Sequence, residues 1–585
     1  MSLHSSTTLD TLGQESQPEP LKKKGWFGYS PAIVILIFVL LVAIVPPVYY
    51  LIQSSFYTTK FDGAWDQLTF RFYSDLFSNP RFLSNFVTTT IYAVGSSIIA
   101  IVVGAALAWI VERTNTPGRG CIFLVSIISL GIPHVLYTVA WLLLLGKTGP
   151  VNFLLKLMFD TDQLILNVNS LWGMILIEGL GFVPLSFLLL SSAFRSADAS
   201  FEEASLVSGA GLMATFRNIT FRLSMPAVLA LMMLIIIRAF ESFEVPALVG
   251  LAGGVHVLTT DIYLATQVEV PPNYGQSAAF SIVMLMIVVI MLHYYSRLSR
   301  NADRYQTITG KGYRPRVMNL GKWRYFMSAA LVFLFLLVIG FPIALIFFAS
   351  FQPYYSGINT EILQHLTLDN YDGIFEPGLF LDSLSNTFIL GIGTATVVAP
   401  FTAVCAWLAV RRYRGGVFLD QLATLPLIFP AIVMGVAFLQ VFLHIPLPLY
   451  GTILSVIIAS CVRYMPYGMR YSYTGILRVH TELEEASSIS GARQATTFVR
   501  IVMPLIAPAL VTCWLFVFLL AVRAVSMPIL LVGIDSKVIA VTLFDLWENG
   551  SVPELAAMGC TWTALMTVIS GTFYILARRY GLKTE

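Results

Sequence analysis

Six charged side chains lie inside long apolar stretches of this sequence, where an ionised group is costly to bury. They are Glu178, Arg238, Glu241, Glu244, Arg463 and Arg523. The carboxylates are suited to bind a hard cation through oxygen, and the arginines to bind an oxyanion through paired hydrogen bonds. We therefore expect these residues to line a path for a small charged solute. The alternative is structural, because Arg238 and Glu241 are three residues apart and could pair on one helix face.

Sequence motifs of enzymatic chemistry are missing. The fragment Gly146-Lys147-Thr148 resembles part of a phosphate-binding loop, but Trp141 stands where that loop needs glycine, so we reject a nucleotide site. No HExxH, GxSxG or paired-cysteine motif occurs. His134 and His444 lie near the ends of apolar stretches, and we interpret them as interface residues rather than metal ligands. We predict no enzymatic activity, no cofactor and no metal site for this chain itself.

A polar phrase occurs twice. "EEASLVSGAGLMATFRNI" begins at Glu202, and "EEASSISGARQATTFVRI" begins 282 residues later. The shared residues with candidate roles are Glu202, Glu203, Ala204, Gly209 and Phe216 in the first copy and Glu484, Glu485, Ala486, Gly491 and Phe498 in the second. Each phrase is long enough for two short helices. The acidic pair suits a helix start, and the glycine suits a turn that a side chain would strain.

Composition places these residues in a bilayer. The 585 residues are 57% hydrophobic and 11% charged, whereas soluble domains carry about 25% charged residues. Windows of about 20 apolar residues, enough to cross a bilayer as helix, recur along the chain and predict an all-α polytopic membrane protein of about twelve spans. The predicted spans are 31–55, 84–111, 121–146, 169–193, 224–247, 274–296, 326–351, 383–410, 417–444, 449–474, 505–530 and 555–577.

The repeat predicts two homologous halves of six helices each. A disordered tail, 1–30, precedes a first half over 31–296, with its polar loop at about 195–224. A basic linker, 297–325, leads to a second half over 326–585, with its polar loop at about 477–506. The first half is longer, mainly around 147–168. The stretch from 31 is too long for the core of a cleavable signal peptide, so we expect it to remain as an anchor.

Basic residues indicate the orientation, because short Lys- and Arg-rich loops stay in the cytoplasm. Lys22, Lys23 and Lys24 precede the first span, and the linker carries eight basic residues against one acid. The loop 352–382 has five acidic residues and no Lys or Arg. Both termini and both polar loops are therefore predicted to be cytoplasmic. Because the basic residues lie where the predicted topology requires them rather than in a nucleic-acid-binding patch, we expect no nucleic-acid partner.

The repeated phrase resembles the "EAA…G" motif of permease subunits in binding-protein-dependent ABC importers of type I. Topology and both loops extend this resemblance over nearly the whole chain. The third alanine of the family motif is Ser205 in the first copy and Ser487 in the second. A proline common after the motif is Pro504 in the second copy but Arg222 in the first.

The resemblance implies that the loops form coupling helices on two copies of a cytoplasmic ATPase, which binds ATP and Mg. It also implies a periplasmic solute-binding protein and a location in the bacterial inner membrane. The segments "RAFESFEVPALVG" and "GKGYRPR" resemble fused permeases assigned to ferric iron import. Relatives with the same plan handle phosphonates such as 2-aminoethylphosphonate, thiamine or other small ions, so the cargo stays open.

Two alternatives belong to other classes. An ion-coupled secondary transporter with two six-span halves would also show repeats and buried charge, but it does not need matched polar loops. A membrane enzyme would need clustered catalytic groups, and a structural scaffold would not need buried charges.

Overall fold

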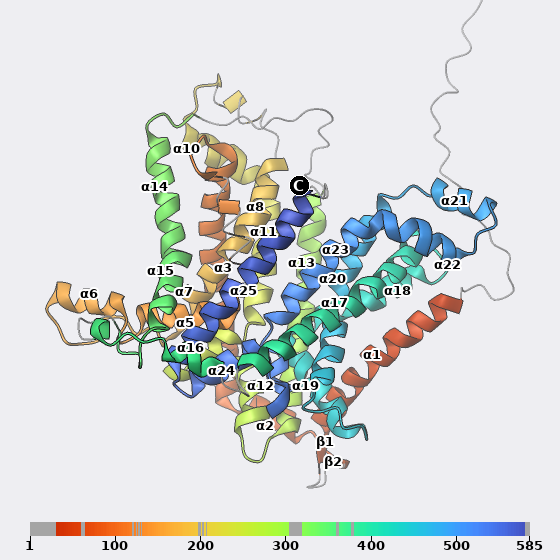
Figure 1. Cartoon of the computed structure of the whole chain (residues 1–585), viewed down its shortest axis with the longest axis horizontal. Helices are drawn as coiled ribbons and strands as arrows, with labels where there is room; N and C mark the ends of the chain where they lie inside the picture. The colour runs from red at the N-terminus through yellow and green to blue at the C-terminus, as the bar shows by residue number, and fades with distance from the viewer. Residues whose placement is uncertain are drawn as a thin grey trace, which may run out of the picture.

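The computed structural model describes residues 31–579 except 60–64, 120–121, 124–125, 127–128, 130–131, 197–200, 202–203, 206, 304–318, 358–361 and 376–379 (Figure 1). The predicted disordered tail, most of the basic linker and the two acidic residues that open the first polar loop, Glu202 and Glu203, lie outside the described residues.

The first half consists of helices and one β-hairpin. Its elements are α1 (Pro31–Phe56), β1 (Tyr57–Thr59), β2 (Trp65–Leu68), α2 (Arg71–Ser78), α3 (Pro80–Arg113), α5 (His134–Leu145), α6 (Pro150–Phe159), α7 (Leu171–Gly181), α8 (Val183–Ser196), α10 (Leu212–Thr215), α11 (Phe221–Phe240), α12 (Leu258–Tyr263) and α13 (Tyr274–Asp303). Strands β1 and β2 pair antiparallel, with Tyr57 opposite Leu68.

The second half is built from helices. Its helices are α14 (Trp323–Phe335), α15 (Phe341–Ala349), α16 (Asp369–Ile374), α17 (Phe380–Val410), α18 (Gly416–Thr424), α19 (Ala431–His444), α20 (Ile453–Leu477), α21 (Glu482–Ile489), α22 (Gln494–Thr497), α23 (Met503–Val522), α24 (Ile539–Glu548) and α25 (Val552–Arg579). A π-helical segment joins each loop to the next span, Phe216–Thr220 before α11 and Phe498–Val502 before α23.

The predicted membrane-spanning architecture is confirmed. Within the described ranges, nine helices are long and apolar enough to cross a bilayer, or up to twelve if each sharply bent pair counts as one span. One bent pair, Pro246–Gly253 with Leu258–Val268, was not predicted. Conversely, the predicted span 449–474 is α20, which is not among these candidates; its arginines and tyrosines make it more polar than the other spans. It packs between α17 and α23.

Proline and glycine explain two of the bends. The predicted span 417–444 turns by 104° between Ile428 and Ala431, where Pro430 fixes the backbone at the start of α19. The predicted span 169–193 bends by 45° between α7 and α8, after Gly181. Both predicted spans are therefore broken helices rather than continuous ones.

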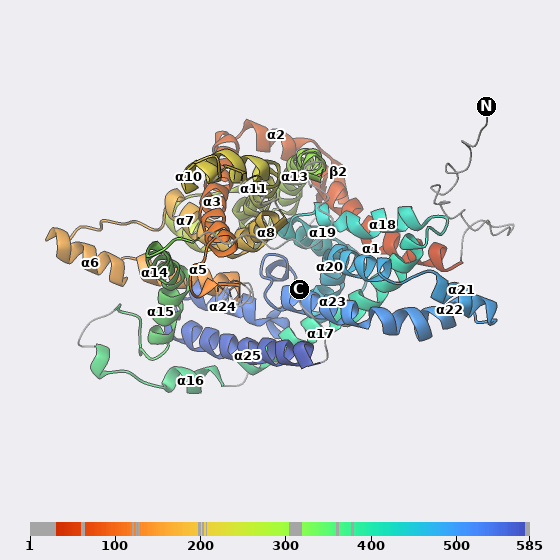
Figure 2. The ribbon, with the colours of Figure 1, turned by 90° about the horizontal axis from the view of Figure 1, so that it is seen from above.

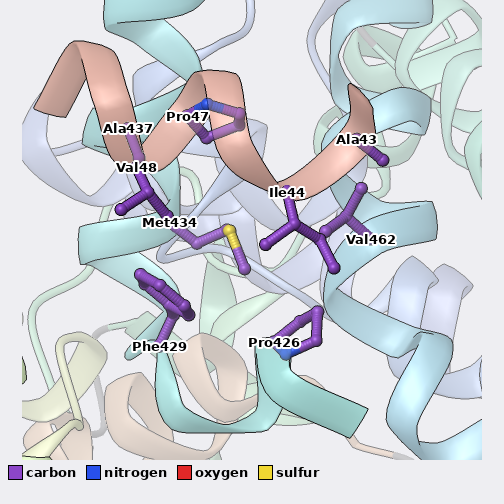
Figure 3. A pocket seen from close by; sticks show the side chains of 9 residues that line it. All are labelled: Ala43, Ile44, Pro47, Val48, Pro426, Phe429, Met434, Ala437 and Val462. Carbon is purple, nitrogen blue, oxygen red and sulfur yellow. The ribbon is translucent and has the colours of Figure 1, made fainter. Parts of the chain in front are cut away.

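The first membrane span of each half packs against the other half. Helix α1 packs on α13 of its own half and on α19 of the second, while α15 packs on α25 of its own half and on α5 of the first. Figure 3 shows a small apolar pocket where α1 crosses α19 and α20. It is lined by Ala43, Ile44, Pro47, Val48, Pro426, Phe429, Met434, Ala437 and Val462. The halves are thus interlocked.

Equivalent contacts relate the two halves residue by residue. The N–H of Leu258 donates to Thr89 Oγ1 at 3.1 Å, and the N–H of Ile539 donates to Thr387 Oγ1 at 2.9 Å. Ser170 caps α7 as Thr452 caps α20. Gly95 lies against Ile175 as Gly393 lies against Ile457. These pairs fix which positions of the halves correspond.

The repeated loops lie at one end of the molecule. Figure 1 shows α10 and α21 at the upper end, on opposite sides, and Figure 2 shows the same wide separation from above. We call this the loop end. Helix α14 begins there and α25 ends there, whereas α2, α6, α16 and the β-hairpin lie at the far end.

Candidate coupling loops and translocation path

Each described loop turns through a left-handed glycine. Gly209 has φ +86° and Gly491 has φ +83°, a conformation that side chains strain. A Cβ at either position would meet nothing within 4 Å. The backbone conformation, not lack of space, is therefore what requires glycine, as the sequence predicts. The structure does not describe the side chain of Phe216.

A matched hydroxyl pair closes both turns. Ser205 Oγ lies 3.0 Å from Thr215 Oγ1, and Ser487 Oγ lies 2.8 Å from Thr497 Oγ1. The serines replace the third alanine of the family motif in both copies. Because each serine has a threonine partner ten residues later, this departure is the same local change made twice.

The second loop is tied to a membrane span through Glu484. Its carboxylate accepts from Arg411 Nη2 at 2.7 Å and from Trp407 Nε1 at 3.0 Å. The side chains of Glu484 and Arg411 are only 14% and 12% exposed. Phe498 is buried, with its ring 5.1 Å from that of Trp407. An ion pair, a hydrogen bond and a ring contact therefore join this loop to the end of α17.

The residues around this ion pair were missed by the sequence analysis, although a signal exists. Ala108-Trp109 is followed by Arg113 in the same spacing as Ala406-Trp407 and Arg411. Arg113 Nη2 donates to Phe194 O at 2.8 Å, and Arg411 Nη2 donates to Val479 O at 2.9 Å. The pKa of Tyr413, which lies near this ion pair, is raised mainly by burial and to a smaller extent by the charge of Glu484.

Each loop exposes one apolar side chain immediately before its turn. Val207 is 86% exposed and Ile489 is 87% exposed, at equivalent positions of the two phrases. Glu485 and Ala486 are also exposed, and Ala204 is exposed in the first loop. A large exposed apolar residue repeated in both loops indicates a contact surface. The sequence analysis did not single out either residue.

Five of the six predicted path residues gather where the halves meet. Arg238 Nη2 donates to Tyr467 of the second half at 2.7 Å, and its Nη1 lies 3.6 Å from Glu241 Oε2. The pairing along one helix therefore exists, but Arg238 also reaches the other half. Arg463 donates to Phe429 O at 2.9 Å and is an electrostatic neighbour of Glu241.

Glu244 and Ser526 occupy equivalent positions and contact each other. Ser526 Oγ donates to Glu244 Oε1 at 2.9 Å, across 282 residues of sequence. A residue that touches its own counterpart lies at the axis relating the halves. Arg523 is the counterpart of Glu241, and its electrostatic neighbours include Glu244 and Arg238. Both α11 and α23 end just before these charges.

Glu178 lies apart from these five, inside the first half. It is buried on α7, and its Oε2 lies 2.9 Å from His134 Nε2. His444 instead stacks on Trp65, with ring centroids 4.1 Å apart, and its Nδ1 lies 2.8 Å from Gln440 O. In the described part of the chain, no three His, Cys, Asp or Glu side chains gather as a metal site.

The chain resembles ferric transport permeases over most of its length. It is 29% identical over 509 residues to the ferric transport system permease protein FbpB of Actinobacillus pleuropneumoniae, which covers 84% of this chain and 69% of the relative. It is 30% identical over 472 residues to the putative ferric transport system permease protein FbpB 1 of Haemophilus influenzae, covering 79% and 71%.

Shorter relatives match about half of the chain. The putative 2-aminoethylphosphonate transport system permease protein PhnV of Salmonella paratyphi A is 23% identical over 252 residues, covering 43% of this chain and 93% of the relative. Residues 100–304 and 398–581 match the family described as the binding-protein-dependent transport system inner membrane component. Each match contains one polar loop. The two matches cover more than half of the sequence, so the chain belongs to this family and is a multi-pass inner-membrane permease of the ABC transporter type.

Proposed function

We propose that this chain is the permease subunit of an ATP-driven importer and moves ferric iron from a periplasmic binding protein to the cytoplasm by alternating access. The observation that carries the proposal is the duplicated loop. Two segments with the same left-handed glycine, the same hydroxyl pair and the same exposed apolar residue lie apart at one end of the molecule. Such a pair suits two copies of one partner.

The partner is a cytoplasmic ATPase that binds ATP and Mg, one copy on each loop. Val207 and Ile489 insert into its surface, and the acidic pairs Glu202-Glu203 and Glu484-Glu485 belong to the two coupling loops. When ATP draws the two ATPase copies together, the loops approach each other. The contact of Glu484 with Arg411 carries this movement into α17, and the path changes between its two states.

The orientation follows from this assignment. The loop end faces the cytoplasm, together with both termini, and the far end receives the binding protein. The remaining partner is the lipid of the membrane, which surrounds the spans. We include no nucleic-acid partner. The family assignment sets aside the ion-coupled secondary transporter, because the polar loops belong to the domains that match the family.

Ferric iron is favoured as cargo by the two ferric relatives, which match most of this chain. The phosphonate permease matches one half only. A phosphonate remains the second candidate because Arg238, Arg463 and Arg523 could bind its oxygens in pairs. The carboxylates of Glu178, Glu241 and Glu244 favour a hard cation.

The test is ATP hydrolysis by the permease and its ATPase in liposomes. The binding protein is added without cargo, loaded with ferric iron, or loaded with 2-aminoethylphosphonate. We expect stimulation by the iron-loaded protein above that by the empty protein. Stimulation only by the phosphonate-loaded protein would replace iron as cargo. Uptake that needs no ATP would contradict the importer itself.

A further inference from the structure

A cluster of buried polar groups lies inside the first half. It brings together Tyr92 of α3, His134 and Tyr137 of α5, Glu178 of α7, and Ser242, which follows α11. Tyr92 and Glu178 are fully buried. Three helices and the loop after α11 thus place oxygen and nitrogen atoms close together.

Four oxygen atoms of this cluster have no hydrogen-bond partner within the described residues. They are the hydroxyls of Tyr92, Tyr137 and Ser242 and the Oε1 atom of Glu178. The Tyr92 hydroxyl is a close polar neighbour of Glu178 and Ser242, and the Tyr137 hydroxyl is a close polar neighbour of Trp141, but these contacts fall short of full hydrogen-bond geometry. A buried polar atom left unpaired costs about 1–3 kcal/mol. Four together indicate that a ligand completes the cluster.

His134 orients the carboxylate toward this ligand. Its Nε2 lies 2.9 Å from Glu178 Oε2, which leaves Oε1 directed away from the imidazole. Gly181 on the same face of α7 lets the rings approach, since a Cβ there would lie 3.1 Å from His134 and 3.3 Å from Tyr137. The arrangement therefore depends on a residue without a side chain.

The second half shows that the fold does not need these groups. At the positions that correspond to Tyr92, His134, Tyr137, Glu178 and Ser242, it carries Leu390, Ala431, Met434, Ser460 and Ala524. The same helices pack in both halves, α3 with α7 and α8 in the first, α17 with α20 in the second. A structural role would be needed twice, so the cluster has a role that only one half performs.

The cluster adjoins the path between the halves. Glu178 is 1% exposed, but the His134 side chain is 31% exposed and forms the accessible edge. The electrostatic neighbours of His134 include Glu244 and Arg523, which belong to the group of charges at the axis. His134 therefore connects the buried carboxylate of Glu178 with the charges at the axis.

The donor set matches a hard metal cation. Such cations prefer oxygen ligands, and phenolate oxygen is a known ligand of iron in proteins. Only His134 and Glu178 belong to the stronger class of acidic and imidazole ligands, fewer than a site for permanent retention would have. A transporter needs binding that is favourable enough to admit the cation and weak enough to release it.

We propose that Glu178, Tyr92, Tyr137 and His134 form a transit site for a hard trivalent metal cation. The proposal rests on the proposed function only in taking ferric iron as that cation. A phenol must lose its proton to bind the metal, so binding releases protons to the medium.

The test uses the full chain in lipid nanodiscs without ATPase or binding protein. Terbium(III) is the probe, because nearby tyrosines sensitise its luminescence, and ferric nitrilotriacetate is the competitor. We expect sensitised luminescence that ferric iron displaces. Glu178→Gln and Tyr137→Phe should each weaken terbium binding by about tenfold or more. The matched control is Ser460→Ala, at the position in the second half that corresponds to Glu178, and it should bind as the unaltered chain does.

Equal terbium binding by Tyr92→Phe, Tyr137→Phe and the unaltered chain, with all three folded, would overturn the site. If Glu178→Gln fails to fold, the two phenylalanine variants still decide. Binding without partners and ATP-dependent uptake are separate measurements. Intact uptake with no terbium site rejects this inference alone, whereas a terbium site with no ATP dependence rejects the proposed importer alone.

Discussion

The coupling loops and the path residues were duplicated together, but only the loops kept their symmetry. Both loops have a left-handed glycine, a serine–threonine contact and an exposed apolar residue at matching positions. In the path, Glu241 corresponds to Arg523 and Glu244 to Ser526. Under the proposed function, two copies of one ATPase would preserve two similar surfaces, whereas a single path needs only one copy of each group.

The divergence also gives the candidate path an acidic side and a basic side. The first half contributes Glu178, Glu241 and Glu244, and the second contributes Arg463 and Arg523. Arg238 is the exception, and it reaches across to Tyr467. A duplicated pore would present each charge twice and repel its own copy across the axis. Unequal halves avoid that repulsion and let acids of one half face bases of the other.

The largest effect is expected from a side chain at the left-handed glycines. Gly209→Val and Gly491→Val should each lower ATP-dependent uptake by about tenfold or more, because a β-branched residue at positive φ strains the turn. Uptake into liposomes measures this. Gly211→Ala, in the same loop but without positive φ and with open space around it, is the control. Loss in only one of the two variants would break the equivalence of the loops.

A smaller effect is expected from Glu484→Gln, which removes the charge that faces Arg411. We expect the stimulation of ATP hydrolysis by loaded binding protein to fall several-fold, since a partly buried hydrogen bond to a charge contributes about 1.5–3 kcal/mol. Glu482→Gln, at the exposed first residue of the same helix, should leave stimulation unchanged. Glu202→Gln should match Glu484→Gln if the first loop uses the same contact, and unequal results would sharpen the difference between halves.

Truncation of the exposed apolar residues should weaken binding of the ATPase rather than the transmission of movement from the loop to the membrane span. Val207→Ser and Ile489→Ser should each lower the affinity for the ATPase by several-fold, because each buried CH2 group is worth about 0.8 kcal/mol. Titration of the ATPase onto immobilised nanodiscs gives the two affinities. Val499→Ser changes another exposed apolar residue, after the turn, and is the comparison variant. Unchanged affinity in both loop variants would remove these residues from the interface.

The smallest effect is expected from Ser205→Ala and Ser487→Ala, which restore the alanine of the family motif. Each removes one hydroxyl contact, worth about 1 kcal/mol. Uptake should change by less than about fivefold, and the two variants should agree within error, because the contact is the same in both loops. A large loss in either variant would mean that the serine itself meets the partner.

The sequence predicted the membrane class, the repeated halves and the two loops because each depends on local pattern. The length of the apolar stretches, the positions of the basic residues and the repeated phrase can all be read from the sequence without knowing which residues are in contact. The glycine turns were predictable for the same reason. The bend of 104° before α19 was only partly visible, since proline marks a break without giving its angle.

Contacts between distant segments were not predictable in this way. His134 was interpreted as an interface residue, and only the fold brings it to Glu178. Tyr92 and Ser242 carried no signal, because single polar residues in apolar helices are common. The comparison of the two halves at matching positions would have identified them, since the second copy lacks every member of the cluster.

The packing of α1 and α15, each against the opposite half, has a consequence for biosynthesis. Helix α1 packs on α19, and α5 packs on α15, so each half leaves a helix without its partner until the other half has been made. During translation, α1 lies in the bilayer without α19 until the second half has been made. Likewise, α5 lies there without α15 until the linker and α15 have been made. The two halves therefore complete their folding together, and a chain interrupted at the linker would leave an unfinished first half for membrane proteases to recognise.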